Sequence, residues 1–118
     1  MENYRYQLPK AFATKWVEAL RSGEYKQGTG YLSFIYRDSA SKVEIRYCCL
    51  GVACSMVGIP DNLLKIEFVL PHFNMPKELI GDRVENGLVQ ILTNMNDREG
   101  GKSFLEIADW IEANVQFI

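Results

Sequence analysis

The sequence lacks the features that mark membrane-spanning, secreted and duplex-binding proteins. No apolar run approaches the roughly 20 residues that a bilayer-spanning helix needs, and the polar residues 1–4 lack the basic and then apolar pattern of a signal peptide. Three cysteines are an odd number, which is untypical of a disulfide framework. The net charge is −2, with basic residues scattered among acidic ones, which disfavours binding to duplex nucleic acid. We therefore expect a cytoplasmic protein with reduced thiols and with no membrane or duplex partner.

Side chains for metal binding and acid–base chemistry are also scarce. His72 is the only histidine. The three cysteines, Cys48, Cys49 and Cys54, lack the Cys-x-x-Cys spacing that is typical of zinc sites. We therefore predict no metal and no cofactor, and an enzymatic role is disfavoured without being excluded.

What the chain does contain is the composition of one globular domain. Its 118 residues are 47% hydrophobic and 24% charged, values that are ordinary for a folded soluble domain. No repeat, linker or low-complexity segment divides the chain. Residues 1–118 are therefore predicted to form a single domain.

Residues 10–21 have the pattern of an amphipathic helix. Pro9 suits the first turn, and Gly23 suits a left-handed cap at the end. One apolar stripe recurs between them at spacings of three and four residues, and it consists of Phe12, Trp16, Val17 and Leu20.

Three further helices are expected in the rest of the chain. Residues 48–57 form an apolar run, and residues 86–95 carry an apolar stripe. The polar pair 96–97 is interpreted as turn chemistry after that stripe. Ser103 and Glu106 have the spacing of a capping box, which opens the last helix. The apolar stripe of that helix consists of Phe104, Ile107, Ala108, Ile111 and Val115.

Two neighbouring segments have the character of strands. Residues 31–36 are aromatic and β-branched, whereas residues 42–47 alternate polar and apolar side chains, as a half-buried strand does. Together they predict an antiparallel hairpin over residues 31–47, with alternate side chains facing the core. Residues 65–70 could add a strand and residues 76–80 a helical turn. The predicted class is α+β, with about four helices packed on a small antiparallel sheet.

Several short motifs, spread along the chain in order, carry a family resemblance. They are Trp16-x-x-Ala19-Leu20-Arg21-Ser22-Gly23, Gln27-Gly28, Cys48-Cys49-Leu50-Gly51-Val52-x-Cys54, Asn96-Asp97 and Ser103-Phe104-x-Glu106-Ile107-Ala108-Asp109-x-Ile111-Glu112. In these motifs the chain resembles a group of small uncharacterised proteins encoded by phages and prophages. The resemblance implies an accessory phage protein in the cytoplasm of a host cell, with a role against host defences. It brings no reaction and no catalytic residues.

The three cysteines lie where the second strand gives way to the second helix. Thiols at a helix N-terminus can be reactive, because the helix dipole favours the thiolate. The cysteines can also simply be small apolar fillers, since free cysteine is among the most buried residue types. In a cysteine hydrolase, Cys48 or Cys49 would be the nucleophile and His72 the base. Cys54 lies deeper in the helix and is expected to be inert.

A second group of candidates surrounds a glycine-bearing loop. Lys26, Gln27 and Gly28 open a donor-rich segment that would lie near the N-terminus of the second helix if the hairpin folds back. Arg46 or Lys26 could pair with a phosphate, and Tyr25, Tyr31 or Tyr47 could stack on a base. The alternative is that the glycines only permit a turn before the strand. The predicted ligand-binding residues are Lys26, Gln27, Gly28, Tyr31, Arg46, Cys48 and Cys49.

Two functional hypotheses follow from the sequence, and they belong to different classes. The favoured one is a non-enzymatic protein that binds and sequesters a small anionic, nucleotide-like ligand without turning it over. The alternative is an interaction module that inhibits a host protein through a surface including Trp110 and the last helix, because tryptophan is enriched at interfaces. A homo-oligomer is compatible with both, since small ligand-binding proteins often build pockets between subunits. A cysteine hydrolase is the third and weakest hypothesis.

Overall fold

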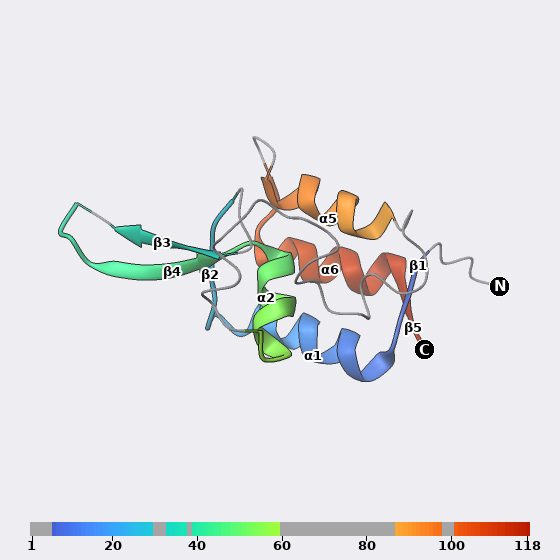
Figure 1. Cartoon of the computed structure of the whole chain (residues 1–118). Coiled ribbons are helices and arrows are strands. Elements are labelled where there is room, and N and C mark those ends of the chain that lie inside the picture. The colour runs from blue at the N-terminus through green and yellow to red at the C-terminus, as the bar shows by residue number, and fades with distance from the viewer. Residues whose placement is uncertain (1–5, 30–32, 38, 60–86, 98–100) are drawn as a thin grey trace.

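The computed structural model describes residues 6–29, 33–37, 39–59, 87–97 and 101–118, which contain four helices and two small sheets. The predicted α+β class is confirmed (Figure 1). The elements in chain order are β1 (Tyr6–Leu8), α1 (Lys10–Arg21), β2 (Lys26–Gln27), β3 (Ser33–Arg37), β4 (Val43–Tyr47), α2 (Cys49–Met56), α5 (Gly87–Asp97), α6 (Phe104–Asn114) and β5 (Val115–Phe117). The strand predicted over 65–70, the turn over 76–80 and His72 lie outside the described residues.

Local signals place the two ends of α1 and the start of α6 where the sequence predicts them. By contrast, α5 includes the pair 96–97 that was interpreted as a turn, and Val115, predicted on the stripe of the last helix, lies in β5. Helix α1 spans the expected residues, and Gly23 follows it with a φ of +78°, a conformation that glycine adopts without steric cost. The capping box of α6 is formed in both directions. The Glu106 amide donates to Ser103 Oγ at 3.2 Å, and the Ser103 amide donates to Glu106 Oε1 at 3.0 Å.

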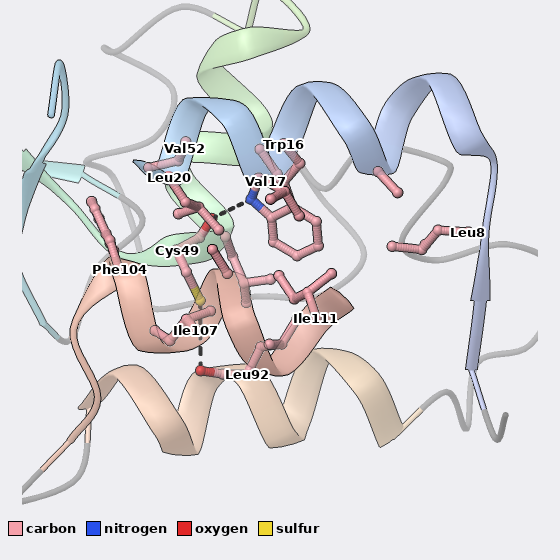
Figure 2. Close-up of a cluster of buried hydrophobic side chains, with 14 of the residues drawn as sticks. Leu8, Trp16, Val17, Leu20, Cys49, Val52, Leu92, Phe104, Ile107 and Ile111 are labelled. Carbon is pink, nitrogen blue, oxygen red and sulfur yellow. Dashed lines mark hydrogen bonds between the residues drawn. The ribbon is translucent and has the colours of Figure 1, made fainter. Parts of the chain in front are cut away.

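The core lies between the four helices, which pack mainly against one another. Trp16 on α1 is fully buried, and its indole N–H donates to the carbonyl of Cys49 at 3.0 Å (Figure 2). Each large apolar side chain that is fully buried contributes about 1.5–3 kcal/mol. The largest fully buried side chains are Trp16, Leu8, Leu50, Leu88, Leu92, Ile107, Ile111 and Val52.

Two sheets lie at opposite ends of this helical body. Strands β1 and β5 pair in parallel, with Tyr6 opposite Val115, and so bring the two ends of the described chain side by side (Figure 1). The other sheet has the order β2-β4-β3. Its antiparallel pair β3–β4, with Ile35 opposite Ile45, confirms the predicted hairpin, and β2 adds a parallel strand. The hairpin extends away from the helices (Figure 1).

Neither a membrane span nor a metal cluster is found in the described part of the chain. Its helices all fall short of the length and apolar character that crossing a bilayer requires. Within the same residues, no three potential metal-ligating side chains (His, Cys, Asp or Glu) come together.

Candidate functional site

The sheet β2-β4-β3 distributes the predicted ligand-binding residues over its two faces. Lys26 on β2 stands opposite Arg46 on β4, and Gln27 stands opposite Tyr47. Because successive side chains of a strand point to opposite faces, Lys26 and Arg46 share one face whereas Gln27 turns to the other with buried Tyr47. The expected single pocket is therefore divided in two. Tyr31 lies outside the described residues.

On the face of the sheet that carries Gln27 and Tyr47, Asn96 at the end of α5 connects α5 with β2 and α2. Its side chain is 2% exposed, and its Nδ2 donates to the Gly28 carbonyl at 2.8 Å and to Asp97 Oδ1 at 2.7 Å. Its Oδ1 accepts from Gln27 Nε2 at 2.9 Å and from the Cys49 amide at 3.2 Å. All four hydrogen-bonding positions of this amide are thus occupied. The sequence interpretation of Asn96 as turn chemistry misses this role, because three of its four partners lie 47 to 69 residues away.

Gln27 extends this network to the start of α6. Its Nε2 also donates to the Lys102 carbonyl at 2.8 Å, and its Oε1 accepts from the Phe104 amide at 3.1 Å. The Gly28 amide donates to the Tyr47 carbonyl at 2.7 Å. The polar groups that made Gln27 and Gly28 candidates for ligand binding are therefore used to connect β2 with β4 and α6.

The N-terminus of α2 differs from the prediction in its accessibility. Cys48 is 2% exposed and Cys49 is fully buried. The Cys49 amide donates to Asn96, and the Gly51 amide donates to Cys48 Sγ at 3.4 Å. These amides are sealed inside the molecule, so the expectation that they present themselves to an anion is wrong. The sequence signal for this is a run that is apolar on all sides, which is typical of a fully buried helix.

Burial also determines the chemistry of the three thiols. Loss of hydration raises the pKa of Cys48 and of Cys54 to about 12, and it raises the pKa of Cys49 well above its ordinary value. Hydrogen bonds from the first amides of α2 lower the pKa of Cys48 but do not offset the loss of hydration. Because a cysteine nucleophile must be a thiolate near neutral pH, these positions argue against the cysteine hydrolase.

The outer face of the sheet is positively charged around one aromatic ring. The Arg46 guanidinium carbon lies 3.5 Å from the centroid of the Tyr36 ring, close enough for a cation–π interaction. Arg46 Nε donates to Glu44 Oε2 at 3.1 Å. Lys26 is exposed beside Arg46 on the same face. Two predicted ligand-binding residues are thus together on one face of the sheet.

The opposite face of the hairpin carries exposed apolar side chains. Ile35 is 52% exposed, Val43 is 55% exposed and Ile45 is 38% exposed. Ile35 stands opposite Ile45, and Val43 follows two residues away on the same face. We call these three side chains the hairpin apolar face. The expectation that the apolar residues of 42–47 face the core is wrong for Val43 and Ile45, because the hairpin extends beyond the helices and only its Tyr47 end reaches them (Figure 1).

Trp110, the other predicted interface residue, is partly buried. Its ring lies 6.3 Å from the ring of Tyr6 on β1, centroid to centroid, at 46°. This tilted pairing is a common way for aromatic rings to pack. Trp110 thus packs partly against β1 in the described residues, as a partly buried rim residue does.

Comparisons with known proteins bear on the first half of the chain. Residues 9–63 match the model of a domain of unknown function (DUF8296), a segment that includes α1, β2, β3, β4 and α2. No curated protein and no solved structure shows a significant match. The matched segment contains the projecting hairpin and the thiol-bearing helix.

Proposed function

We propose that this chain is a non-enzymatic interaction protein that binds another protein through its β3–β4 hairpin. The observation that carries the proposal is the hairpin apolar face, which is exposed on an arm outside the core (Figure 1). Single exposed apolar residues are ordinary, but neighbouring ones on a projecting element are typical of an interaction surface. A two-stranded ribbon is only marginally stable alone, so burial against a partner would also stabilise the arm.

The resemblance to phage and prophage proteins supports a partner from the host cell. In this proposal the target is a host protein in the cytoplasm, and binding inhibits it as part of a counter-defence role. Inhibition by binding needs no reactive group, which agrees with the buried thiols at the start of α2.

The test places a photo-crosslinking amino acid at Val43 and, as a matched control, at exposed Lys15 on α1. Host cells producing each variant are irradiated, and the crosslinked proteins are identified by mass spectrometry. Position 43 should enrich one host protein that position 15 does not, and Ile35→Asp should remove this enrichment. The same background of crosslinks from both positions would contradict the proposal.

A second candidate function retains the anionic ligand on a smaller surface. The observation that favours it is the pairing of Lys26 with Arg46, whose guanidinium stacks on Tyr36. A phosphate group would bind between the two cations, because an arginine guanidinium can donate two hydrogen bonds to one phosphate. Calorimetric titration with cyclic and ADP-ribose-type nucleotides should give heat that Arg46→Ala abolishes. Absence of heat with all of these nucleotides would remove this candidate.

A further inference from the structure

The main-chain groups of β3 have an orientation that the sheet register determines. The Tyr47 carbonyl accepts from the amide of Gly28, the residue that follows β2, so the main-chain groups of Tyr47 point toward β2. Because consecutive residues of a strand alternate in this direction, Arg46 and Glu44 point toward β3. The residues opposite Arg46 and Glu44 on β3 are residues 34 and 36, which therefore pair back with β4.

The remaining residues of β3 turn the other way. Ser33, Ile35 and Arg37 direct their N–H and C=O groups to the outer side of β3, where the sheet order places no strand from the described residues. An edge of this kind is a template on which another extended chain can pair. The hairpin apolar face lies on one side of that edge, because Ile35 belongs to both.

Positive charge exceeds negative charge in the segment that forms the sheet β2-β4-β3. Residues 26–47 contain four basic and two acidic residues, whereas the whole chain has a net charge of −2. The Arg46 guanidinium lies over Tyr36, so its charge is displaced toward β3 and its open edge. Glu44 accepts from Nε of Arg46, and a guanidinium has further N–H groups that can bind a second carboxylate.

We infer that β3 accepts an extended segment of the partner protein as an added strand, and that this segment alternates apolar and acidic side chains. Its apolar side chains pack on the hairpin apolar face, and its carboxylates meet Arg46 beside Tyr36 on the other face. This inference rests on the proposed function and specifies its partner. A strand added to an edge gains affinity from main-chain hydrogen bonds and specificity from alternate side chains.

The test titrates the full chain with three fluorescent heptapeptides and measures anisotropy. The first alternates valine and glutamate, the second alternates valine and lysine, and the third is the first with its three central amides N-methylated. The first should bind about tenfold or more tightly than the other two, because the second reverses the charge and the third cannot form the main-chain pairing. Equal binding of the three peptides, or binding of none, would overturn the inference.

Substitutions at one position separate main-chain pairing from side-chain contact. Ile35→Pro removes an N–H that faces the open edge and leaves the bonds to β4 in place, since proline is tolerated on edge strands. Ile35→Pro should weaken binding of the valine–glutamate peptide about tenfold or more, whereas Ile35→Val should leave binding within about twofold of the parent chain. Near-ultraviolet circular dichroism of buried Trp16 reports that the fold is retained. Unchanged binding by Ile35→Pro would overturn the inference.

Other occupants of the edge give different results. Preferential binding of a labelled DNA duplex in the same assay, or self-association that Ile35→Pro abolishes, would assign β3 to a nucleic acid or to a second copy and overturn the inference. Failure of the proposed function is distinguishable. If crosslinking from position 43 still enriches one host protein in the Ile35→Pro variant, strand addition is wrong and the interaction role stands.

Discussion

The N-terminus of α2 and the β3–β4 hairpin adjoin at Tyr47, yet they satisfy their polar and apolar groups in opposite ways. Around α2, Asn96 uses all four of its hydrogen-bonding positions within the chain, and the thiols of Cys48 and Cys49 are buried. In the hairpin, three apolar side chains are exposed, and the outer edge of β3 has no neighbouring strand among the described residues. A region whose groups are satisfied internally has little to offer a ligand. The region that leaves them unsatisfied is the better candidate for recognition.

The largest effect is expected where the internal network is broken. Asn96→Ala leaves the Cys49 amide and the Gly28 carbonyl without their partner in a buried site. Because each buried polar group left unpaired costs about 1–3 kcal/mol, the free energy of unfolding should fall by about 3 kcal/mol or more. Urea denaturation, monitored by tryptophan fluorescence, measures this loss in the free energy of unfolding.

A control for this substitution lies on the same helix. Asn94 accepts a 3.4 Å hydrogen bond from Gln90 on the exposed side of α5, so Asn94→Ala should change the free energy of unfolding by less than about 0.5 kcal/mol. A similar loss for both variants would show that α5, and not the buried network, sets the stability at this end of the body.

A smaller effect is expected from a single thiol as the pH rises from 9 to 10.5. Burial raises the pKa of Cys54 to about 12 in the folded chain, so the folded state keeps a proton that the unfolded state loses above pH 9. Stability from this group is complete below the unfolded pKa and is lost between about pH 9 and 12. The expected loss is about 1.4 kcal/mol per pH unit for each such thiol. Denaturation at pH 8, 9.5 and 10.5 measures the slope.

The matched variant for that slope is Cys54→Ala. It changes stability at neutral pH through packing, but its loss of stability above pH 9 should be shallower than that of the parent chain by the contribution of one thiol. Parallel curves for the two proteins would mean that Cys54 ionises in the folded state as readily as in the unfolded chain. The α2 region would then be less sealed than the comparison with the hairpin assumes.

The parts of this molecule that short-range signals control could be predicted from sequence. Gly23 ends α1, and Ser103 with Glu106 opens α6, because each acts within four residues of its own position. The pairing of β3 with β4 is also local. Alternation along β4 defines its apolar face, but it does not say how far the strand extends beyond the helices. Val43 and Ile45 were therefore wrongly expected to face the core, although Tyr47 on the same face is buried.

The candidate site could be predicted only in part, for a related reason. Lys26 and Arg46 come together as expected, because a parallel strand pair brings them opposite each other. Gln27 lies on the other face because side chains alternate along β2, and its amide is occupied by Asn96 and Phe104, which are distant in sequence. The sequence of a loop looks the same whether its hydrogen-bonding side chains contact a ligand or another part of the chain.

The smallest effect on stability is expected in the hairpin, and it completes the comparison. Ile35→Asp replaces a side chain that is already 52% exposed by a carboxylate, so the free energy of unfolding should change by less than about 0.5 kcal/mol. The same change at fully buried Ile107 would unfold the body, since an unpaired charge would be buried. Denaturation of Ile35→Asp beside its crosslinking assay separates the two roles. Lost binding with unchanged stability assigns Ile35 to recognition, whereas a loss of about 2 kcal/mol would make the hairpin apolar face part of the fold.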